Sequence, residues 1–502
     1  MKSIAIIGGG VAGLAAGIFA QRSGFSSEIH EKHAIPGGQC TAWKRKGYTL
    51  DNCVHWLTGT DSARDIHTLW EQLGVLGPEV EMIRPEAFFE LESNGEKLVF
   101  WKDLERLRKE LLELSPEDAD EIELFINNVR TYEAVDMLAL KPKEMLSPLE
   151  FLRKLKAMKE VGKIHGIYSK MTIGEYASRF RHPLLRRMIT AYMPETYNVA
   201  SVFFVYGVFC SGNGDLPKGG SPGIIARMTA LYESLGGRIT TSHEATGIEL
   251  SGKRIKAVRF SDGSVASADW YVFACDTYET FSKIIGPRFM DRYFRDRYVD
   301  KADDYRIYNT FNCYFSVDGK ASDVIPSWSV ALTPEQPLNV LGTDVDNILL
   351  KHFDYEPDYA PEGHSVLQAM FTLYESDYMK WSQLRNADLP GYRMEKEALG
   401  QQVMDMITDR YPALKGRLEL LDATTPVTYE RYCNAYKGAY MSFILTPYTP
   451  KVSHKGYIKG LDNAMLSGQW LQSPGGLPNA AATGRFTIQR ICRRERIRFK
   501  EI

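Results

Sequence analysis

The alternation of apolar and polar positions at the start of the chain predicts a strand, a helix and a second strand. Residues 3–7 form a short apolar run, which is typical of a strand buried on both faces. Residues 11–22 fit a helix that ends before Gly24, and residues 27–32 fit the next strand. A β-α-β unit of about thirty residues is the layout of a dinucleotide-binding fold.

The pattern changes after this unit. Residues from about 115 to 200 predict mostly helix, with Ser115 as N-cap and Pro116 at the first helical position. Residues 290–450 are mixed, rich in aromatic side chains and only weakly periodic. Strand and helix patterns return elsewhere, with a helix at 222–235, strands at 238–241, 246–250, 255–260, 269–274 and 464–467, and a final helix after a Gly/Pro loop.

Composition narrows the class of protein. With 502 residues the chain is too long for a single hydrophobic core. A net charge of −2 gives no reason to expect a nucleic-acid partner. The seven cysteines include no C-x-x-C pair, so we expect reduced thiols in a cytoplasmic protein rather than a zinc site or a disulfide framework. The uncharged run from Ser3 to Ala20 imitates a signal peptide, but its glycines favour the dinucleotide-binding interpretation.

A glycine motif carries the first chemistry. Gly8-x-Gly10-x-x-Gly13 follows the first strand and opens the first helix. Gly8 permits the tight turn, Gly10 lets the backbone approach a pyrophosphate, and Gly13 allows close helix–strand packing. Glu31, eighteen residues after Gly13, is placed to accept hydrogen bonds from ribose hydroxyls. The motif predicts a bound dinucleotide without separating FAD from NAD.

Further motifs resemble the flavin amine oxidase and phytoene desaturase superfamily. They are Glu31-Lys32 with Gly37-Gly38 and 47–51, the middle stretch 217–221, and the C-terminal stretches 463–469, 475–478 and 481–485. Within it, the sequence from Asp51 through His55 and Trp56 to Gly59 is most similar to the retinol saturase and carotenoid desaturase branch. Two positions depart from the superfamily pattern: Gln469 replaces an acidic residue, and Cys53 replaces a glycine.

The resemblance implies FAD as the cofactor and a discontinuous α/β fold. Residues 1–75, 215–290 and 455–495 would form a split Rossmann-like FAD-binding domain, and residues 76–214 and 291–454 an inserted mixed α+β substrate domain. The residues expected to bind FAD are Gly8, Gly10, Gly13, Glu31, Lys32, Gly38, Gln39, Asp51, Ala245, Gly468, Gln469, Gly476, Leu477 and Ala480.

The activity that the resemblance implies is desaturation or saturation of C–C/C=C bonds in an apolar polyene or isoprenoid substrate. Two alternatives stay open: a flavin amine oxidase, and a flavin-binding isomerase or lipid-binding protein without net redox turnover. Because the chain has no second G-x-G-x-x-G, electrons must pass through one flavin. Their partner would be oxygen, a quinone or a nicotinamide.

Four side chains are candidates for the reaction site. His55 lies on the loop expected to enter the flavin region, and histidine is readily poised as an acid or base near neutral pH. Tyr432, Tyr436 and Tyr440 correspond to a stretch that shapes the substrate cavity in relatives. Structural roles, as a hydrogen-bonded histidine and as core aromatics, are the alternatives.

A basic stretch suggests a second kind of contact. Residues 141–170 carry eight Lys or Arg and three Glu, and Phe151, Leu155, Met158 and Val161 recur at helical spacing. A basic amphipathic helix docks on anionic membrane surfaces, here the inner face of the membrane. The alternative is a lysine-rich helix that packs on its own core.

Overall fold

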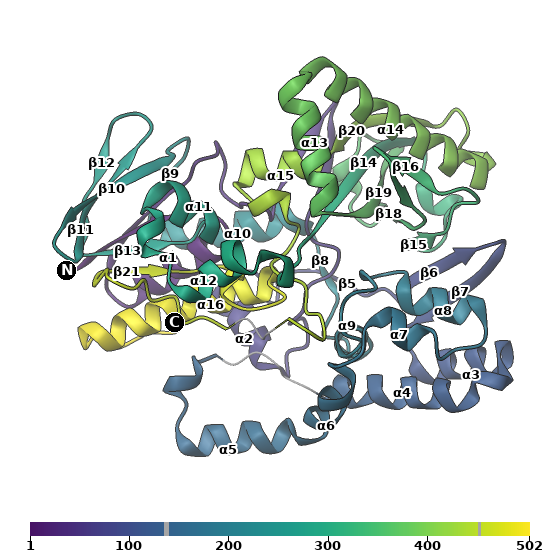
Figure 1. The fold of residues 1–502 in the computed structure, drawn as a ribbon, viewed down its shortest axis with the longest axis horizontal. Helices are drawn as coiled ribbons and strands as arrows, with labels where there is room; N and C mark the ends of the chain where they lie inside the picture. Colours follow the sequence, from purple (N-terminus) through teal and green to yellow (C-terminus); the bar gives the residue numbers. More distant parts are fainter. Residues whose placement is uncertain (135–139, 450–452) are drawn as a thin grey trace.

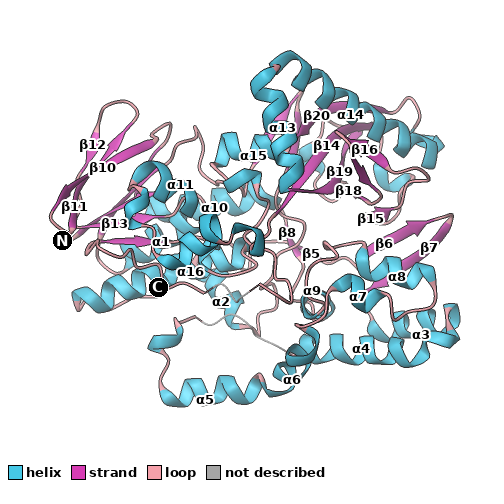
Figure 2. Ribbon diagram, in the orientation of Figure 1, coloured by secondary structure: helices cyan, strands magenta, loops and turns pink. Residues whose placement is uncertain are grey.

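The computed structural model describes residues 1–134, 140–449 and 453–502 (Figures 1 and 2). A parallel sheet assembles from the three predicted pieces of the cofactor domain. Ile4 and Ile6 of its central strand pack against helices on one face, while Ala5 and Ile7 pack into a core on the other face. The strand order is β21 (Ala464–Leu466), β13 (Trp270–Phe273), β1 (Ser3–Ile7), β2 (Ser26–His30) and β9 (Arg238–Thr240).

Helices and a small sheet cover the two faces of this parallel sheet. The helices are α1 (Val11–Arg22), α10 (Gly220–Ser234) and α16 (Gly476–Glu495), and the small antiparallel sheet comprises β10 (Ala245–Ser251), β11 (Arg254–Phe260) and β12 (Val265–Ala266). A Cβ added at Gly484 of α16 would lie 2.5 Å from the Ala12 oxygen of α1, so the glycine permits their close approach. The predicted α/β fold with a split dinucleotide-binding unit is confirmed.

A seven-stranded sheet forms a second layer of the protein. Its order is β20 (Leu418–Thr424), β14 (Tyr308–Asp318), β19 (His364–Tyr374), β18 (Ile348–His352), β15 (Ser329–Leu332), β6 (Ala87–Ser93) and β7 (Glu96–Trp101). Helices α13 (Glu375–Ala387) and α14 (Leu389–Arg410) contribute side chains to the same core. The sheet joins strands from both segments of the predicted substrate domain. Because β14 is buried on both faces, its sequence has no alternation to reveal it.

Helices form a third group beside this sheet (Figure 2). They are α3 (Leu104–Leu114), α4 (Ala119–Glu133), α6 (Lys159–Tyr168), α7 (Ile173–Ala177), α8 (Pro183–Thr190) and α9 (Ala200–Cys210). The largely helical character expected of this region is confirmed. The expected start, with Ser115 as N-cap and Pro116 at the first helical position, is confirmed, although the first turn (Pro116–Asp118) is 3-10 and leads directly into α4. The Ser115 hydroxyl donates to the Asp118 carboxylate at 2.8 Å and does not cap a backbone N–H.

Shorter elements connect these layers, and most predicted boundaries agree with them to within two residues. β2 ends at His30 rather than at residue 32, and α10 begins at Gly220 rather than at residue 222. The remaining elements include α2 (Asp65–Gln72), α15 (Pro426–Cys433), and the paired strands β3 (Ala42–Arg45) with β4 (Tyr48–Asp51) and β5 (Met82–Ile83) with β8 (Leu216–Pro217). None of the helices within the described ranges is both long and apolar enough to cross a membrane.

Candidate functional site

A cavity of about 1550 Å³ extends from the carboxyl ends of β1 and β2 to the helical group. This volume exceeds the ~300–1,000 Å³ of a typical single-ligand pocket. One part of its wall comes from the glycine-rich turn and the end of β2, and the other from aromatic and aliphatic side chains. The cavity therefore has room for a dinucleotide and a second, apolar molecule.

Two helices begin at this cavity with glycine as the N-cap residue. The N-caps are Gly10 for α1 and Gly475 for α16, and neither makes a side-chain cap hydrogen bond. Helix N-termini present free N–H groups and the positive end of the helix dipole, which favour anions. Gly8 has a φ of 109°, and an added Cβ would lie 2.9 Å from the Ala274 oxygen, so the turn requires glycine there. This cradle fits a pyrophosphate.

Glu31 is fixed at the end of β2 beside that cradle. Its Oε2 accepts a hydrogen bond from the Gly9 N–H at 2.6 Å, and its Oε1 accepts one from the His33 N–H at 2.8 Å. Each carboxylate oxygen retains a further lone pair. Glu31 thus holds the glycine turn in place and lines the cavity, where it can accept from ribose hydroxyls.

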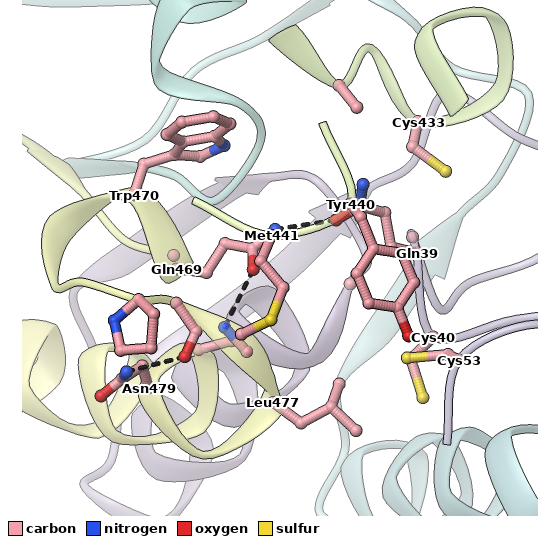
Figure 3. Close-up of a pocket in the computed structure, with 18 of the residues that line it drawn as sticks. Gln39, Cys40, Cys53, Cys433, Tyr440, Met441, Gln469, Trp470, Leu477 and Asn479 are labelled. Carbon is pink, nitrogen blue, oxygen red and sulfur yellow. Dashed lines mark hydrogen bonds between the residues drawn. The ribbon is translucent and has the colours of Figure 1, made fainter. Parts of the chain in front are cut away.

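Gln469, the residue that departs from the superfamily pattern, links two parts of the site (Figure 3). Its Nε2 donates to Gln39 Oε1 at 2.7 Å, and its Oε1 accepts from the Gly476 N–H at 3.0 Å. Gln39 Nε2 in turn donates to the Ala439 oxygen at 2.7 Å. An amide can both donate and accept, so it bridges the loop after β2 to the first turn of α16 where a carboxylate could only accept. The other departure, Cys53, does not adopt a positive φ.

Most of the predicted cofactor-binding residues lie on the cavity wall. They are Gly8, Gly10, Glu31, Lys32, Gly38, Gln39, Ala245, Gly468, Gln469, Gly476, Leu477 and Ala480. Gly13 does not lie on this wall. An added Cβ there would lie 1.9 Å from the Gly8 oxygen, which matches its predicted role in helix–strand packing. Contact of the wall residues with FAD stays a prediction.

Two predicted site residues are placed elsewhere. Asp51 is not on the cavity wall, because its carboxylate accepts from the Ser221 N–H at 2.8 Å and the Tyr359 hydroxyl at 3.0 Å. Asp51 therefore holds the end of β4 against Ser221 and Tyr359. Tyr436 is also outside the cavity: its ring packs 4.8 Å from those of Tyr278 and Tyr298 in the core, which is the structural role that was the alternative for it.

His55 lies on the cavity wall in an unusual environment. Both ring nitrogens are buried, and neither has a hydrogen-bond partner within the described residues. Burial, with a smaller contribution from the Lys351 charge, lowers the pKa of His55 to about 3. Burial likewise lowers the pKa of Lys351, whose Nζ donates to the Val54 oxygen at 2.8 Å, to about 8. Near neutral pH His55 is therefore an uncharged imidazole that can donate one hydrogen bond and accept another.

The two tyrosines that remain candidates differ in setting. Tyr440 is buried, with its ring 6.4 Å from that of His55. Burial raises the pKa of Tyr440 well above its usual range, so its hydroxyl stays protonated. Tyr432 is 46% exposed and packs edge-on against His33 at 5.5 Å. Tyr440 is thus a neighbour of His55 inside the cavity, whereas Tyr432 lines a part of the cavity that is exposed to solvent.

Sequence reasoning missed a chain of hydrogen bonds that ends at the cavity. Ser264 Oγ donates to Asp262 at 2.6 Å, so it accepts from His243 Nε2 at 2.7 Å. In a neutral His243 the Nδ1 is then the acceptor of a hydrogen bond from His30 Nδ1 at 3.0 Å. This leaves His30 Nε2 as a buried acceptor without a partner within the described residues, beside Glu31. The position of His30, one residue before Glu31, is the feature of the sequence that could have pointed to it.

Another part of the cavity wall is largely apolar. Its wall there includes Trp56, Tyr192, Tyr197, Phe204, Val205, Tyr308, Leu349, Met370 and Leu445. Side chains of the basic stretch also line the cavity: Phe151, Lys154 and Leu155 of α5 (Pro148–Ala157), and Met158 beyond it.

The basic stretch is two helices rather than one, with a break at Met158 between α5 and α6. α5 buries none of its residues, and Leu152 and Leu155 are 61% and 53% exposed. Figure 1 shows α5 extending below the body of the protein. Val161 of α6, in contrast, is buried in the helical core. The expectation that the whole stretch packs on its own core is therefore wrong for α5.

Comparison with known proteins agrees with this geometry. Residues 6–73 match the family described as an NAD(P)-binding Rossmann-like domain. The chain is 22% identical to the 4,4'-diapophytoene desaturase of Methylomonas sp, over 100% of this chain and 97% of the relative. It is also 22% identical to the chloroplastic prolycopene isomerase of Daucus carota, over 87% of this chain and 71% of the relative.

A solved structure extends the comparison to the fold. The cyclohexylamine oxidase of Brevibacterium oxydans superposes with a TM-score of 0.58 at 14% identity, covering 99% of both chains. At this identity the likeness concerns the fold alone. The predicted resemblance to the phytoene desaturase branch of the superfamily is confirmed. The chain thus has a dinucleotide-binding oxidoreductase fold and is similar along its length to enzymes of carotenoid conversion.

Proposed function

We propose that the protein is an FAD-dependent oxidoreductase that desaturates an apolar polyene or isoprenoid chain. One observation carries the proposal: a single cavity joins an uncapped helix start and the Glu31 carboxylate, which is placed to accept from a ribose, to a large apolar wall. The match of the whole chain to a 4,4'-diapophytoene desaturase supports this substrate class. We also propose that the domain division predicted from the sequence corresponds to cofactor and substrate halves of this cavity.

Bound FAD would supply hydride acceptance. The chain's own residues would bind and orient it: the N-termini of α1 and α16 hold its phosphates and stabilise negative charge, while Glu31 and His30 Nε2 accept from the adenosine end. The apolar wall would exclude water and align the substrate chain. His55, uncharged and without a hydrogen-bond partner among the described residues, is available to hydrogen-bond to a group in the cavity and orient it.

A flavin-dependent isomerase is the second candidate, because prolycopene isomerases are also among the relatives. The amine oxidase alternative has support from fold likeness alone. Loss of two hydrogens from the product separates desaturation from isomerisation, since an isomer keeps the mass of its substrate.

Anaerobic mixing of FAD-loaded protein with a C30 or C40 polyene tests the proposal. A desaturase reduces one flavin per double bond formed, and the product mass falls by two. Subsequent addition of oxygen, a quinone or a nicotinamide identifies the electron acceptor by the rate of flavin reoxidation. A polyene that isomerises with the flavin fully oxidised would favour the second candidate, and an inert polyene with FAD bound would refute both.

We further infer that α5 docks on an anionic membrane, with the protein otherwise in the cytoplasm. Arg153, Lys156 and Lys159 are exposed beside the exposed leucines of α5, and other side chains of the same helix line the cavity. An apolar substrate could then pass from the lipid to the cavity beneath α5 without crossing water.

Vesicle sedimentation tests this docking. The protein should bind anionic vesicles, with less binding as salt rises, because charges are screened within ~10 Å at 0.1 M. Replacement of Arg153, Lys156 and Lys159 by Gln should abolish binding, while the matched replacement of exposed Lys253, Lys256 and Lys320 by Gln should not. Equal binding of neutral and anionic vesicles would contradict the electrostatic contribution.

A further inference from the structure

Two of the seven cysteines face each other across the hairpin of β3 and β4. Ala42 pairs with Asp51, and the Asn52 N–H donates to the Thr41 oxygen at 3.2 Å. One position beyond the Thr41–Asn52 pair, the same register places Cys40 opposite Cys53. At this position the two facing residues of an antiparallel pair do not exchange backbone hydrogen bonds. Such sites bring Cα atoms to about 4.5 Å, within the ~4.4–6.8 Å that a disulfide spans.

The thiols of this pair are in contact. Cys40 is buried, and its hydrogen bond with the Cys53 thiol, together with burial, raises the pKa of Cys40 well above its usual value. Figure 3 shows the two sulfur atoms next to each other, and Tyr440 is close enough to Cys53 to interact with it electrostatically. All seven cysteines are free thiols in the structure, so the pair is present in its reduced form.

The position of the pair is what distinguishes it from an inert buried thiol. Both cysteines line the cavity: Cys40 directly follows Gln39 in the segment before β3, and Cys53 lies two residues before His55 in the segment after β4. Gln39 in turn contacts Gln469 near the first turn of α16. The pair therefore lies between the cofactor-binding residues and the apolar wall. Cys433 also lines the cavity, but it lies apart from the other two sulfurs in Figure 3.

We propose that Cys40 and Cys53 form a redox-active dithiol–disulfide pair that exchanges two electrons with the bound flavin. In one direction the S–S bond breaks, reduced flavin is oxidised by two electrons, and two protons complete the two thiols. In the other direction both S–H bonds break, the S–S bond forms, and oxidised flavin takes up the two electrons with the released protons. This rests on the proposed function, because it requires FAD in this cavity.

The pair would then store a second pair of electrons beside the flavin. The disulfide accepts electrons that oxidation of the substrate has placed on the flavin, and the cavity holds both carriers. Cys53 is partly exposed, so a small-molecule thiol or disulfide that enters the cavity would reach it by exchange.

Thiol counting tests whether the disulfide forms. FAD-loaded protein is equilibrated with oxidised glutathione, denatured, alkylated and weighed. We expect five alkylated cysteines of seven and a linked peptide containing Cys40 and Cys53. Cys433→Ser is the matched control, because it changes a cavity thiol outside the pair and should still form the link. Seven alkylated cysteines in the wild type would overturn the proposal.

Anaerobic reductive titration tests exchange with the flavin. The oxidised wild type should consume four electrons per FAD. Part of the flavin should keep its oxidised absorbance until the disulfide has been reduced. Cys53→Ser should consume two, and Cys53→Ala provides a second variant if the first fails to fold. Two electrons per FAD in the wild type would overturn the inference. Neither readout uses a polyene, so four-electron uptake without polyene oxidation would refute the proposed function alone.

Discussion

Replacement of His55 by leucine should remove a pH-dependent loss of stability. The pKa of His55 is about 3 in the folded protein, compared with 6.5 for an ordinary histidine. Between these values the unfolded chain binds the proton and the folded protein does not. Stability is therefore fully present above about pH 6.5 and falls as the pH decreases toward 3.

The magnitude follows from the two pKa values. A pH of 5 lies about 1.5 units below the pKa of this histidine in the unfolded chain. Protonation of the unfolded chain therefore destabilises the fold by about 2 kcal/mol at pH 5 relative to pH 8. His55→Leu should lack this part of the loss. Burial lowers the pKa of His30 to about 4, so His30 adds a loss of the same sign at pH 5 in both proteins.

Urea unfolding at pH 8, 6.5 and 5 provides the assay. The difference in unfolding free energy between His55→Leu and wild type should shift in favour of the variant by about 2 kcal/mol between pH 8 and pH 5. The flavin-free protein is used, so ligand binding does not enter. A difference that stays constant with pH would show that the His55 ring is protonated or hydrogen-bonded in the folded protein, contrary to the structure.

The remaining predictions concern the site. His55→Ala should retain FAD and lose ~10²–10⁴-fold in single-turnover flavin reduction if it moves the proton, and a wild-type rate would make it a packing residue. Glu31→Gln should raise the FAD dissociation constant in fluorescence titration, because hydrogen bonds to a charged acceptor contribute ~1.5–3 kcal/mol each; unchanged affinity would refute its placement. Gly13→Ala should destabilise the protein by at least ~1–3 kcal/mol in thermal unfolding, since its Cβ meets the Gly8 oxygen. The matched Gly162→Ala, in open space on α6, should be neutral or stabilising.

Much of the cofactor half of the cavity could be predicted because its chemistry is local. The turn after β1 and the Glu31 carboxylate lie within one β-α-β unit, where strand, glycine spacing and helix all point to the same ligand. Asp51 shows where a motif misleads: its place in the sequence matches the pattern, yet Ser221 and Tyr359 occupy its carboxylate. Those partners are distant in sequence, so no local pattern reveals them.

The sequence by itself determined the dinucleotide-binding unit and the α/β fold class, because these depend on short-range periodicity and motif spacing. Its motifs also carried the resemblance to carotenoid desaturases. Only the tertiary structure decided that His55 is buried and uncharged, that His30 is held in one tautomer, and that Cys40 meets Cys53 at the cavity wall. Burial, tautomer and thiol contact depend on groups that lie far apart in the chain or across a hairpin. Side-chain chemistry is set by these neighbours, and folding alone brings them together.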